Sequence, residues 1–157
     1  MDSYLVENIK ITSKAFENGG TIPLKYTGKG EDISPDLQLS SISPTAKSIA
    51  VIMDDFDHPM GIFNHWVIWN IPVMKEIPEA IPPGAIVSSL NGAVQGIGYG
   101  KNRYKGPNPP FGTHRYKYQI YVLDKLIDLG SDAGKEELLK KMKGHILQYG
   151  SITGMFR

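Results

Sequence analysis

Two short segments of the sequence concentrate side chains that accept, donate or exchange protons. The first holds three carboxylates within four residues, those of Asp54, Asp55 and Asp57. Carboxylates this close repel each other, so at least one has a raised pKa unless a cation or hydrogen-bond donors compensate. Pro59 stiffens the segment, and His65 follows at the start of an apolar run. The pattern predicts a tight loop that aims an imidazole into a cleft.

The second segment leads from a loop of glycine and proline into another apolar run. Gly106 opens the loop, Asn108 lies between prolines, and His114 and Tyr116 follow it. Alternation along a strand places His114 and Tyr116 on one face. An imidazole and a phenol on one face, beside backbone N–H groups of a glycine-rich turn, form a receptor for an oxyanion. Positive potential just upstream comes from three further side chains, Lys101, Arg103 and Lys105.

Each of these features also has a purely structural reading. An Asp-x-Asp pair is usually a solvated turn, a histidine that begins a strand is usually structural, and a loop rich in proline and glycine is usually a connector. Their joint occurrence, with each segment leading into a strong apolar strand, favours a small polar pocket.

Length and composition limit the classes of protein. A chain of 157 residues predicts a single domain over residues 1–157. The net charge of +1 argues against a dedicated nucleic-acid binder, which usually has a large basic excess. The absence of cysteine excludes disulfides, thiolate metal sites and cysteine nucleophiles. The first residues, 1–7, show no signal sequence, and the longest apolar run, 49–53, is too short to cross a bilayer, so we expect a cytoplasmic protein.

The sequence predicts mostly strands. The expected strands cover residues 6–11, 22–26, 37–39, 48–53, 65–71 and 116–123, with a last one over 151–157. Residues 48–53 and 65–71 are apolar on both faces, which indicates central strands. One helix is expected late in the chain, capped by Ser131 or Asp132 and with an apolar stripe that extends to Ile146. Residues 72–115 are rich in turns, and a long irregular stretch of this kind usually folds over a site. This pattern predicts an all-β sandwich with a helical appendage.

The two segments resemble the paired signature of the phosphatidylethanolamine-binding protein family, also called the Raf kinase inhibitor family. The first family motif is Asp-Pro-Asp-Ala-Pro, followed by a histidine that enters a strand; residues 55–59 read Asp-Phe-Asp-His-Pro, and His65 follows. The second runs from a glycine- and proline-rich loop into His-Arg-Tyr; residues 106–110 read Gly-Pro-Asn-Pro-Pro, and residues 114–116 read His-Arg-Tyr. The resemblance extends over the whole chain.

The chain also departs from the family pattern. Phe56 replaces a proline, His58 replaces an alanine, and Asn108 stands where many prokaryotic members have a cysteine. The longer C-terminal helix of animal members, which borders their pocket, is absent. We also expect the His58–Pro59 peptide bond to be cis, because cis proline is usually confined to tight, fixed turns.

The resemblance implies an antiparallel β-sandwich of this family's type, with one or two short C-terminal helices and a small anion pocket at one end. It implies that Asp55, His65, His114 and Tyr116 line the pocket, and that Asp57, Pro59, Gly106 and Asn108 shape its wall. The implied ligands are phosphoryl groups, phospholipid head groups or nucleotides. The implied partners are a kinase or a serine protease, and a second copy of the chain in a homodimer.

Three functions remain open at this point. The first, which we favour, is a binding module that needs no catalytic residue, metal or cofactor and regulates a protein partner. The second is an acid–base or metal-assisted hydrolase that uses the aspartates and histidines, although the ligand spacing matches no strong metal motif. The third is a serine protease inhibitor that presents residues 77–84 or 106–111 as a rigid loop.

Overall fold

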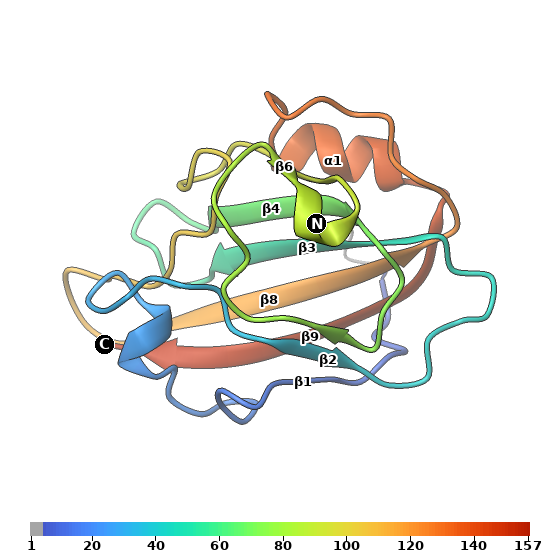
Figure 1. The fold of residues 1–157 in the computed structure, drawn as a ribbon. Coiled ribbons are helices and arrows are strands. Elements are labelled where there is room, and N and C mark those ends of the chain that lie inside the picture. Colours follow the sequence, from blue (N-terminus) through green and yellow to red (C-terminus); the bar gives the residue numbers. More distant parts are fainter. Residues whose placement is uncertain (1–4) are drawn as a thin grey trace.

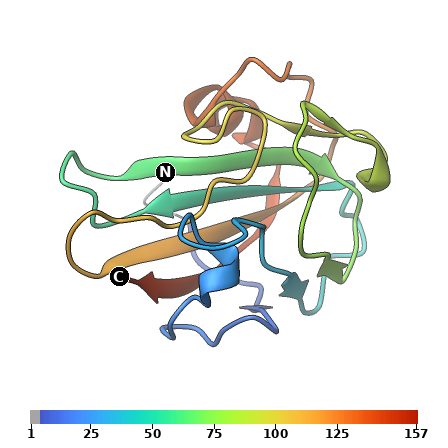
Figure 2. The ribbon, with the colours of Figure 1, turned by 60° about the vertical axis from the view of Figure 1, so that its left-hand side comes forward.

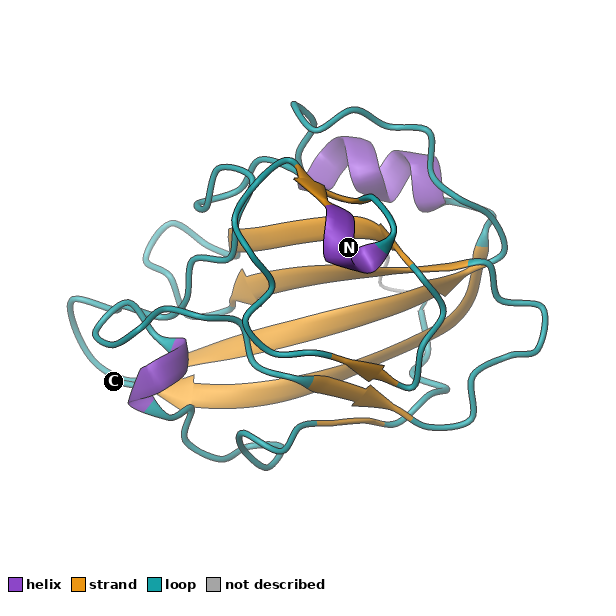
Figure 3. Cartoon of the chain, viewed as in Figure 1, coloured by secondary structure: helices purple, strands orange, loops and turns teal. Residues whose placement is uncertain are grey.

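The computed structural model describes residues 5–157, which form two antiparallel sheets and one α-helix (Figures 1 and 3). The large sheet has the order β6-β7-β4-β3-β8-β9, and the small sheet has the order β1-β2-β5. The strands of the large sheet are β3 (Ser48–Asp55), β4 (Phe63–Ile71), β6 (Ile86–Val87), β7 (Ala93–Gln95), β8 (His114–Leu123) and β9 (Ile146–Phe156). Those of the small sheet are β1 (Ile11–Thr12), β2 (Leu37–Leu39) and β5 (Glu76–Ile77).

The large sheet is covered on both faces, which explains why its central strands are apolar throughout. Every residue of β3 is buried. Val51 belongs to the core shared with the small sheet, which includes Leu37. Its neighbour Ile52 belongs to a second core, which includes Leu138 of the helix. The expected all-β sandwich with a short C-terminal helix is therefore confirmed, as is the double burial of residues 48–53.

The helix α1 (Lys135–Met142) begins later than the sequence pattern predicts. Ser131 and Asp132 were the expected caps, but the N-cap position is occupied by Gly134, whose N–H donates to the Glu137 carboxylate at 2.8 Å. The acidic first turn and basic last turn match the expectation and suit the helix dipole. The cap prediction was wrong because Glu137 supplies the capping bond from inside the helix.

The C-terminal strand is longer than expected. The apolar stripe of the helix was predicted to reach Ile146, but Gly144, at φ +84°, ends the helical region, and Ile146 begins β9. The last strand therefore covers Ile146–Phe156 rather than only residues 151–157. His145 consequently lies outside the helix, next to Asp124, at 2.9 Å between Nδ1 and Oδ1.

Two of the expected N-terminal strands are wrong. In place of the expected strand over residues 6–11 there is only the short strand Ile11–Thr12. The expected strand over residues 22–26 contains a 3-10 helix at Leu24–Tyr26 instead. Pro23 precedes that helix and has no N–H to donate to a sheet ladder. Thr21 still forms an isolated bridge with Met155 of β9, so the segment runs beside the sheet without joining it as a strand.

The turn-rich stretch from 72 to 115 contains β5, β6, β7, a 3-10 helix at Ser88–Leu90 and the first two residues of β8, and is otherwise irregular. Figure 2 shows it in green to yellow, arching over the strands of the large sheet. Buried Gln95 stabilises the arch by donating to the carbonyls of Pro82 and Gly84 at 2.9 Å each. Asn102 donates to the Gln95 carbonyl at 2.7 Å. These bonds give a segment with little secondary structure a defined shape.

No helix in residues 5–157 has the length and apolar character needed to span a membrane. The signal-sequence expectation rested partly on residues 1–4, which lie outside the described residues.

Candidate functional site

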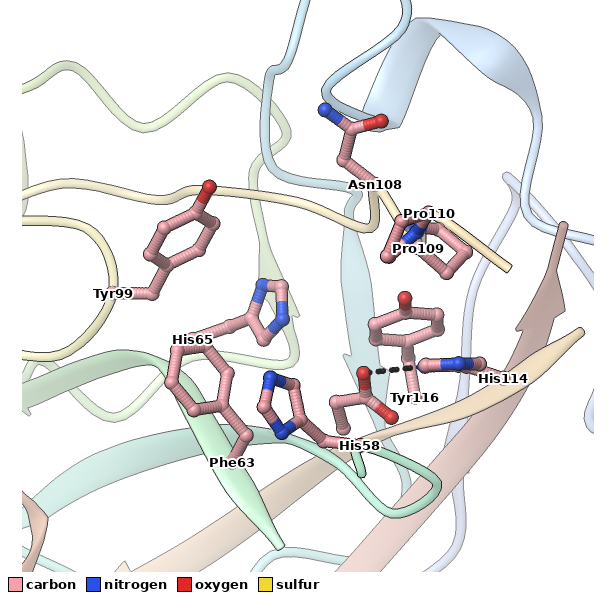
Figure 4. A pocket seen from close by; sticks show the side chains of 10 residues that line it. His58, Phe63, His65, Tyr99, Asn108, Pro109, Pro110, His114 and Tyr116 are labelled. Carbon is pink, nitrogen blue, oxygen red and sulfur yellow. Dashed lines mark hydrogen bonds and ion pairs between the residues drawn. The ribbon is translucent and has the colours of Figure 1, made fainter. Parts of the chain in front are cut away.

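A pocket of about 200 Å³ lies where the ends of β3, β4 and β8 meet the loops of residues 56–62, 96–100 and 106–113 (Figure 4). Drug-sized ligands usually occupy pockets of about 300–1,000 Å³, so this one suits a smaller group. Strand pairing assembles it, because Asp55 lies opposite Phe63 on β4 and opposite Tyr116 on β8. Its walls consist of Asp55, His58, Phe63, His65, Tyr99, Asn108, Pro109, Pro110, His114 and Tyr116.

His114 and Asp55 form a buried pair at the pocket wall. The Nδ1 atom of His114 lies 2.7 Å from Oδ2 of Asp55, and the two side chains are only 9% and 3% exposed. The other oxygen of Asp55 accepts the N–H of Asp57 at 2.8 Å. The carboxylate therefore fixes the orientation of the imidazole and leaves its Nε2 available for a ligand.

Tyr116 lies between the two predicted histidines. Its ring centroid is 5.4 Å from that of His65 and 6.2 Å from that of His114. Burial is the main cause that raises the pKa of the Tyr116 hydroxyl; the Asp55 carboxylate raises this pKa further, and the backbone of Asn108 lowers it. The hydroxyl therefore keeps its proton at neutral pH and can donate it to a bound anion.

His65 is held by a backbone carbonyl. Its Nδ1 lies 2.7 Å from the carbonyl oxygen of Lys105, and the residue is 4% exposed. Burial lowers the pKa of His65, although the Lys105 carbonyl and nearby carboxylates act in the opposite direction. Tyr99 and Tyr116 make edge contacts with its ring, at 5.2 and 5.4 Å between centroids. A neutral imidazole is therefore fixed in place inside the pocket.

His58 also lines the pocket, a role that the sequence reasoning missed. Its ring stacks on Phe63 with centroids 4.4 Å apart and an angle of 16° between the planes. Its Nδ1 accepts the N–H of Met60 at 3.1 Å. The residue was recognised only as a departure from the family motif, and its position next to a proline was the available signal.

The expectation of a cis bond before Pro59 is wrong, because the His58–Pro59 bond is trans. The N–H of Gly61 donates to the carbonyl of His58 at 2.9 Å, which closes a four-residue turn with Pro59 at its second position. A trans proline is favoured at that position of common turns. Pro59 is exposed and does not line the pocket.

Asp57 stabilises the loop of residues 56–62 from outside the pocket. Its carboxylate accepts two bonds of 2.9 Å from the Arg115 guanidinium and one of 2.8 Å from the Arg115 backbone N–H. The Arg115 side chain is the main cause that lowers the pKa of Asp57 to about 2. The predicted repulsion between carboxylates is therefore compensated by a cation at this position.

Asp54 is directed away from the pocket. It is fully buried, and its Oδ2 accepts from Lys135 at 2.6 Å and from Gln119 at 2.9 Å, while its Oδ1 accepts from Asn64 at 3.0 Å. The three aspartates thus have three separate environments: Asp55 lines the pocket, Asp57 stabilises the loop beside it, and Asp54 binds the helix.

The proline-rich loop is anchored from behind by the segment that follows Pro23. The N–H of Gly106 donates to Asp32 Oδ1 at 2.7 Å, and the carbonyl of Pro107 accepts from the N–H of Gly28 at 2.8 Å. A Cβ atom on Gly106 would collide with the carbonyl oxygen of Tyr26, so glycine is required there. Gly106 is buried behind the pocket, and Asn108 forms part of its lining.

Of the eight predicted site residues, the structure places five on the pocket wall: Asp55, His65, Asn108, His114 and Tyr116. Besides His58, four lining residues were not predicted: Phe63, Tyr99, Pro109 and Pro110. The two prolines lie within the predicted loop. Tyr99 comes from the irregular stretch, and nothing in its immediate sequence indicates the pocket.

An all-β sandwich with a small pocket of histidine, tyrosine and aspartate at one end of its large sheet defines a class of small-ligand-binding proteins. The sequence profile of the family described as phosphatidylethanolamine-binding protein matches residues 12–157. The chain belongs to the phosphatidylethanolamine-binding protein family.

Similar proteins agree with this assignment. A UPF0098 protein of Archaeoglobus fulgidus is 48% identical over 143 residues, which cover 90% of this chain and 49% of that protein, so the chain spans about half the length of this relative. A UPF0098 protein of Pyrococcus abyssi is 44% identical, with 96% of this chain and 85% of that protein covered. The crystal structure of a phosphatidylethanolamine-binding protein homologue from Chlamydia trachomatis superposes with a TM-score of 0.85 at 33% identity, covering 97% of this chain and 99% of that one.

Proposed function

We propose that the protein binds a small oxyanion, such as a phosphoryl group, in this pocket, and that the bound state regulates a protein partner. The observation that carries the proposal is the buried His114–Asp55 pair, at 2.7 Å, beside the protonated hydroxyl of Tyr116. Imidazole and phenol donors make strong hydrogen bonds to an oxyanion in a site from which water is largely excluded. The volume of about 200 Å³ suits a phosphoryl group and leaves any attached group outside the pocket.

The lining favours binding over hydrolysis. Among its ten residues there is no serine, threonine, cysteine or lysine, the side chains that most often serve as activated nucleophiles. Asp55 faces His114, where it orients the imidazole, and its other oxygen is occupied by the Asp57 N–H. Within residues 5–157, no group of three or more histidine, cysteine or acidic side chains is arranged to hold a metal ion.

Histidine NMR during a titration with methylphosphonate tests the proposal. We expect the ring resonances of His58, His65 and His114 to shift with one common saturation curve, because all three line the pocket. His145 is the internal control, because it pairs with Asp124 and does not line the pocket. Its ring resonances should not shift. A titration that moves none of the three pocket histidines would reject anion binding at this site.

Exposed apolar side chains beside the pocket support a protein partner. Met60 is 90% exposed on the loop that contains His58, and Phe111 is 84% exposed directly after Pro110. Both side chains lie within two residues of a residue that lines the pocket, so a partner that covers the pocket would also bury apolar surface. A kinase or a serine protease is the partner class that we propose.

One observation favours serine protease inhibition as a second candidate. Phe111 projects from a loop whose shape is fixed by prolines and by the Gly106–Asp32 hydrogen bond, as an inhibitor loop requires. A protease with a chymotrypsin-like hydrophobic specificity pocket would accept this side chain. Inhibition of such a protease that is lost in Phe111→Ala would support this candidate, and unaffected proteolysis at high protein excess would reject it.

A further inference from the structure

His65 presents a hydrogen-bond acceptor to the pocket when it is neutral. The Lys105 carbonyl can only accept, so the bond of 2.7 Å to Nδ1 requires that Nδ1 carries the proton. In a neutral imidazole the other nitrogen, Nε2, then has a lone pair and no proton. Figure 4 shows that this second nitrogen is directed into the pocket, toward Tyr116. No partner for it occurs among residues 5–157.

His58 has the opposite assignment. A backbone N–H can only donate, so the bond of 3.1 Å from Met60 requires that Nδ1 of His58 is the acceptor. The proton of the neutral ring is then on Nε2, and Figure 4 shows this nitrogen directed toward His65 and the interior of the pocket. The two imidazoles therefore present a donor and an acceptor to the same small volume.

We propose that the pocket selects oxyanions that carry a proton, such as a singly charged phosphonate or phosphomonoester, over fully ionised ones such as sulfonates and sulfate esters. The proposal rests on the proposed anion-binding function and specifies the ligand. A P–OH group donates to Nε2 of His65, while the charged oxygens of the same ligand accept from His58 and Tyr116. A sulfonate has only acceptors, so one of its oxygens would face the lone pair of His65.

The groups around His65 agree with its role as an acceptor. The titratable groups that share the pocket with it are Asp55, His58, Tyr99, His114 and Tyr116, and Lys105 binds it through its backbone carbonyl. The charges of Asp54, on the other face of β3, and of Asp32 act on it from outside the pocket. The carboxylates raise the pKa of His65, but burial is the larger effect and lowers it. Neutral His114 has the same arrangement, because its Nδ1 donates to Asp55 and its Nε2 is then an acceptor, so a proton on the ligand can bond to either ring.

The experiment compares methylphosphonate with methanesulfonate by isothermal titration calorimetry over about pH 5–8, a range that brackets the usual histidine pKa. The two ligands have the same shape, and the phosphonate monoanion differs from the sulfonate by a single proton. We expect the phosphonate, at equal monoanion concentration, to bind roughly tenfold or more tightly at neutral pH, because an unmatched buried polar group is costly. The preference should shrink as the pH falls through the pKa of His65, since protonated Nε2 becomes a donor.

Two variants test whether His65 causes the preference for the phosphonate. His65→Gln replaces the fixed acceptor with an amide that can turn either its donor or its acceptor into the pocket, so the preference should fall several-fold, and an unchanged preference would overturn the role of His65. His58→Ala is the matched control: it removes the donor, weakens both ligands and leaves the preference in place. If His65→Gln fails to fold, the pH dependence of the preference in the unaltered protein still tests the proposal.

The outcomes separate the two proposals. Binding of both ligands with equal affinity at neutral pH would overturn the proton selection and leave the anion pocket intact. Binding of neither ligand would overturn the anion pocket, and the selection with it.

Discussion

Asp54 and Asp55 are neighbours in β3, yet their carboxylates serve opposite faces of the large sheet. Asp55 bonds to His114 at the pocket, whereas Asp54 bonds to Lys135 at the start of α1. Successive side chains of a strand point to opposite faces, so this separation follows directly from the extended backbone. The same two residues therefore link the pocket end of the sheet to the helix that covers its other face.

The first prediction concerns the pocket. His114→Ala should weaken methylphosphonate binding by about 1.5–3 kcal/mol, the usual range for a hydrogen bond to a charged group. His145→Ala is the control, because this histidine also pairs with an aspartate but is 39% exposed and outside the pocket. Calorimetry measures both affinities, and equal loss in the two variants would count against the site.

The second prediction concerns the buried ion pair on the helix face. Lys135→Met should destabilise the fold by about 3 kcal/mol, because it leaves the Asp54 charge buried without its cation. The additional change Asp54→Asn should restore part of the stability, since the charge is then absent. Lys140→Met, on an exposed position of the same helix, is the control. Urea unfolding measures the three free energies, and an unchanged midpoint for Lys135→Met would contradict the assignment.

The third prediction follows from the low pKa of Asp57. Because this pKa is about 2 in the folded protein, below its usual value of 3.8, the Asp57–Arg115 pair stabilises the fold above about pH 4. The contribution is lost as the pH falls from 3.8 through about 2. The pair is partly exposed, so we expect about 1 kcal/mol or less.

Arg115→Gln should remove this pH dependence from unfolding curves recorded in acid. Arg103→Gln is a suitable control, because the Arg103 guanidinium donates to an uncharged group, the carbonyl of Tyr104, which does not titrate. Parallel loss of stability on acidification in the unaltered protein and in Arg115→Gln would refute the role of this pair.

The fourth prediction concerns His65 and the stability of the whole protein. Its folded pKa is lowered below 6.5 by burial, so its contribution to stability is present above pH 6.5 and is lost as the pH falls through the folded pKa. His65→Asn should therefore show a smaller drop in melting temperature between neutral and mildly acidic pH. Thermal unfolding of both proteins across this range measures the difference, and identical pH profiles would contradict the assignment.

Much of the fold was predictable from short-range patterns. The strands at 48–53 and 65–71 were identified because strands buried on both faces are apolar throughout, and the strand at 116–123 because its apolar residues alternate; β3, β4 and β8 contain these residues. The two motifs also pointed to half of the residues that line the pocket, because alternation places His114 on the same face as Tyr116 and the family resemblance implies Asp55, His65 and Asn108.

The tertiary structure decided which partner each side chain has. The sequence by itself determined that Asp54, Asp55 and Asp57 are close, but their partners, Lys135, His114 and Arg115, come from other segments. The position of the ring proton in His58 and His65 also depends on distant segments or loop geometry. The N–H of Met60 places the proton of His58 on Nε2, and the carbonyl of Lys105 places that of His65 on Nδ1. Periodicity reports which face of a strand is buried, because burial repeats along the chain. Hydrogen-bond partners and protonation depend on which groups from distant parts of the chain come within about 3 Å, and only the folded arrangement determines that.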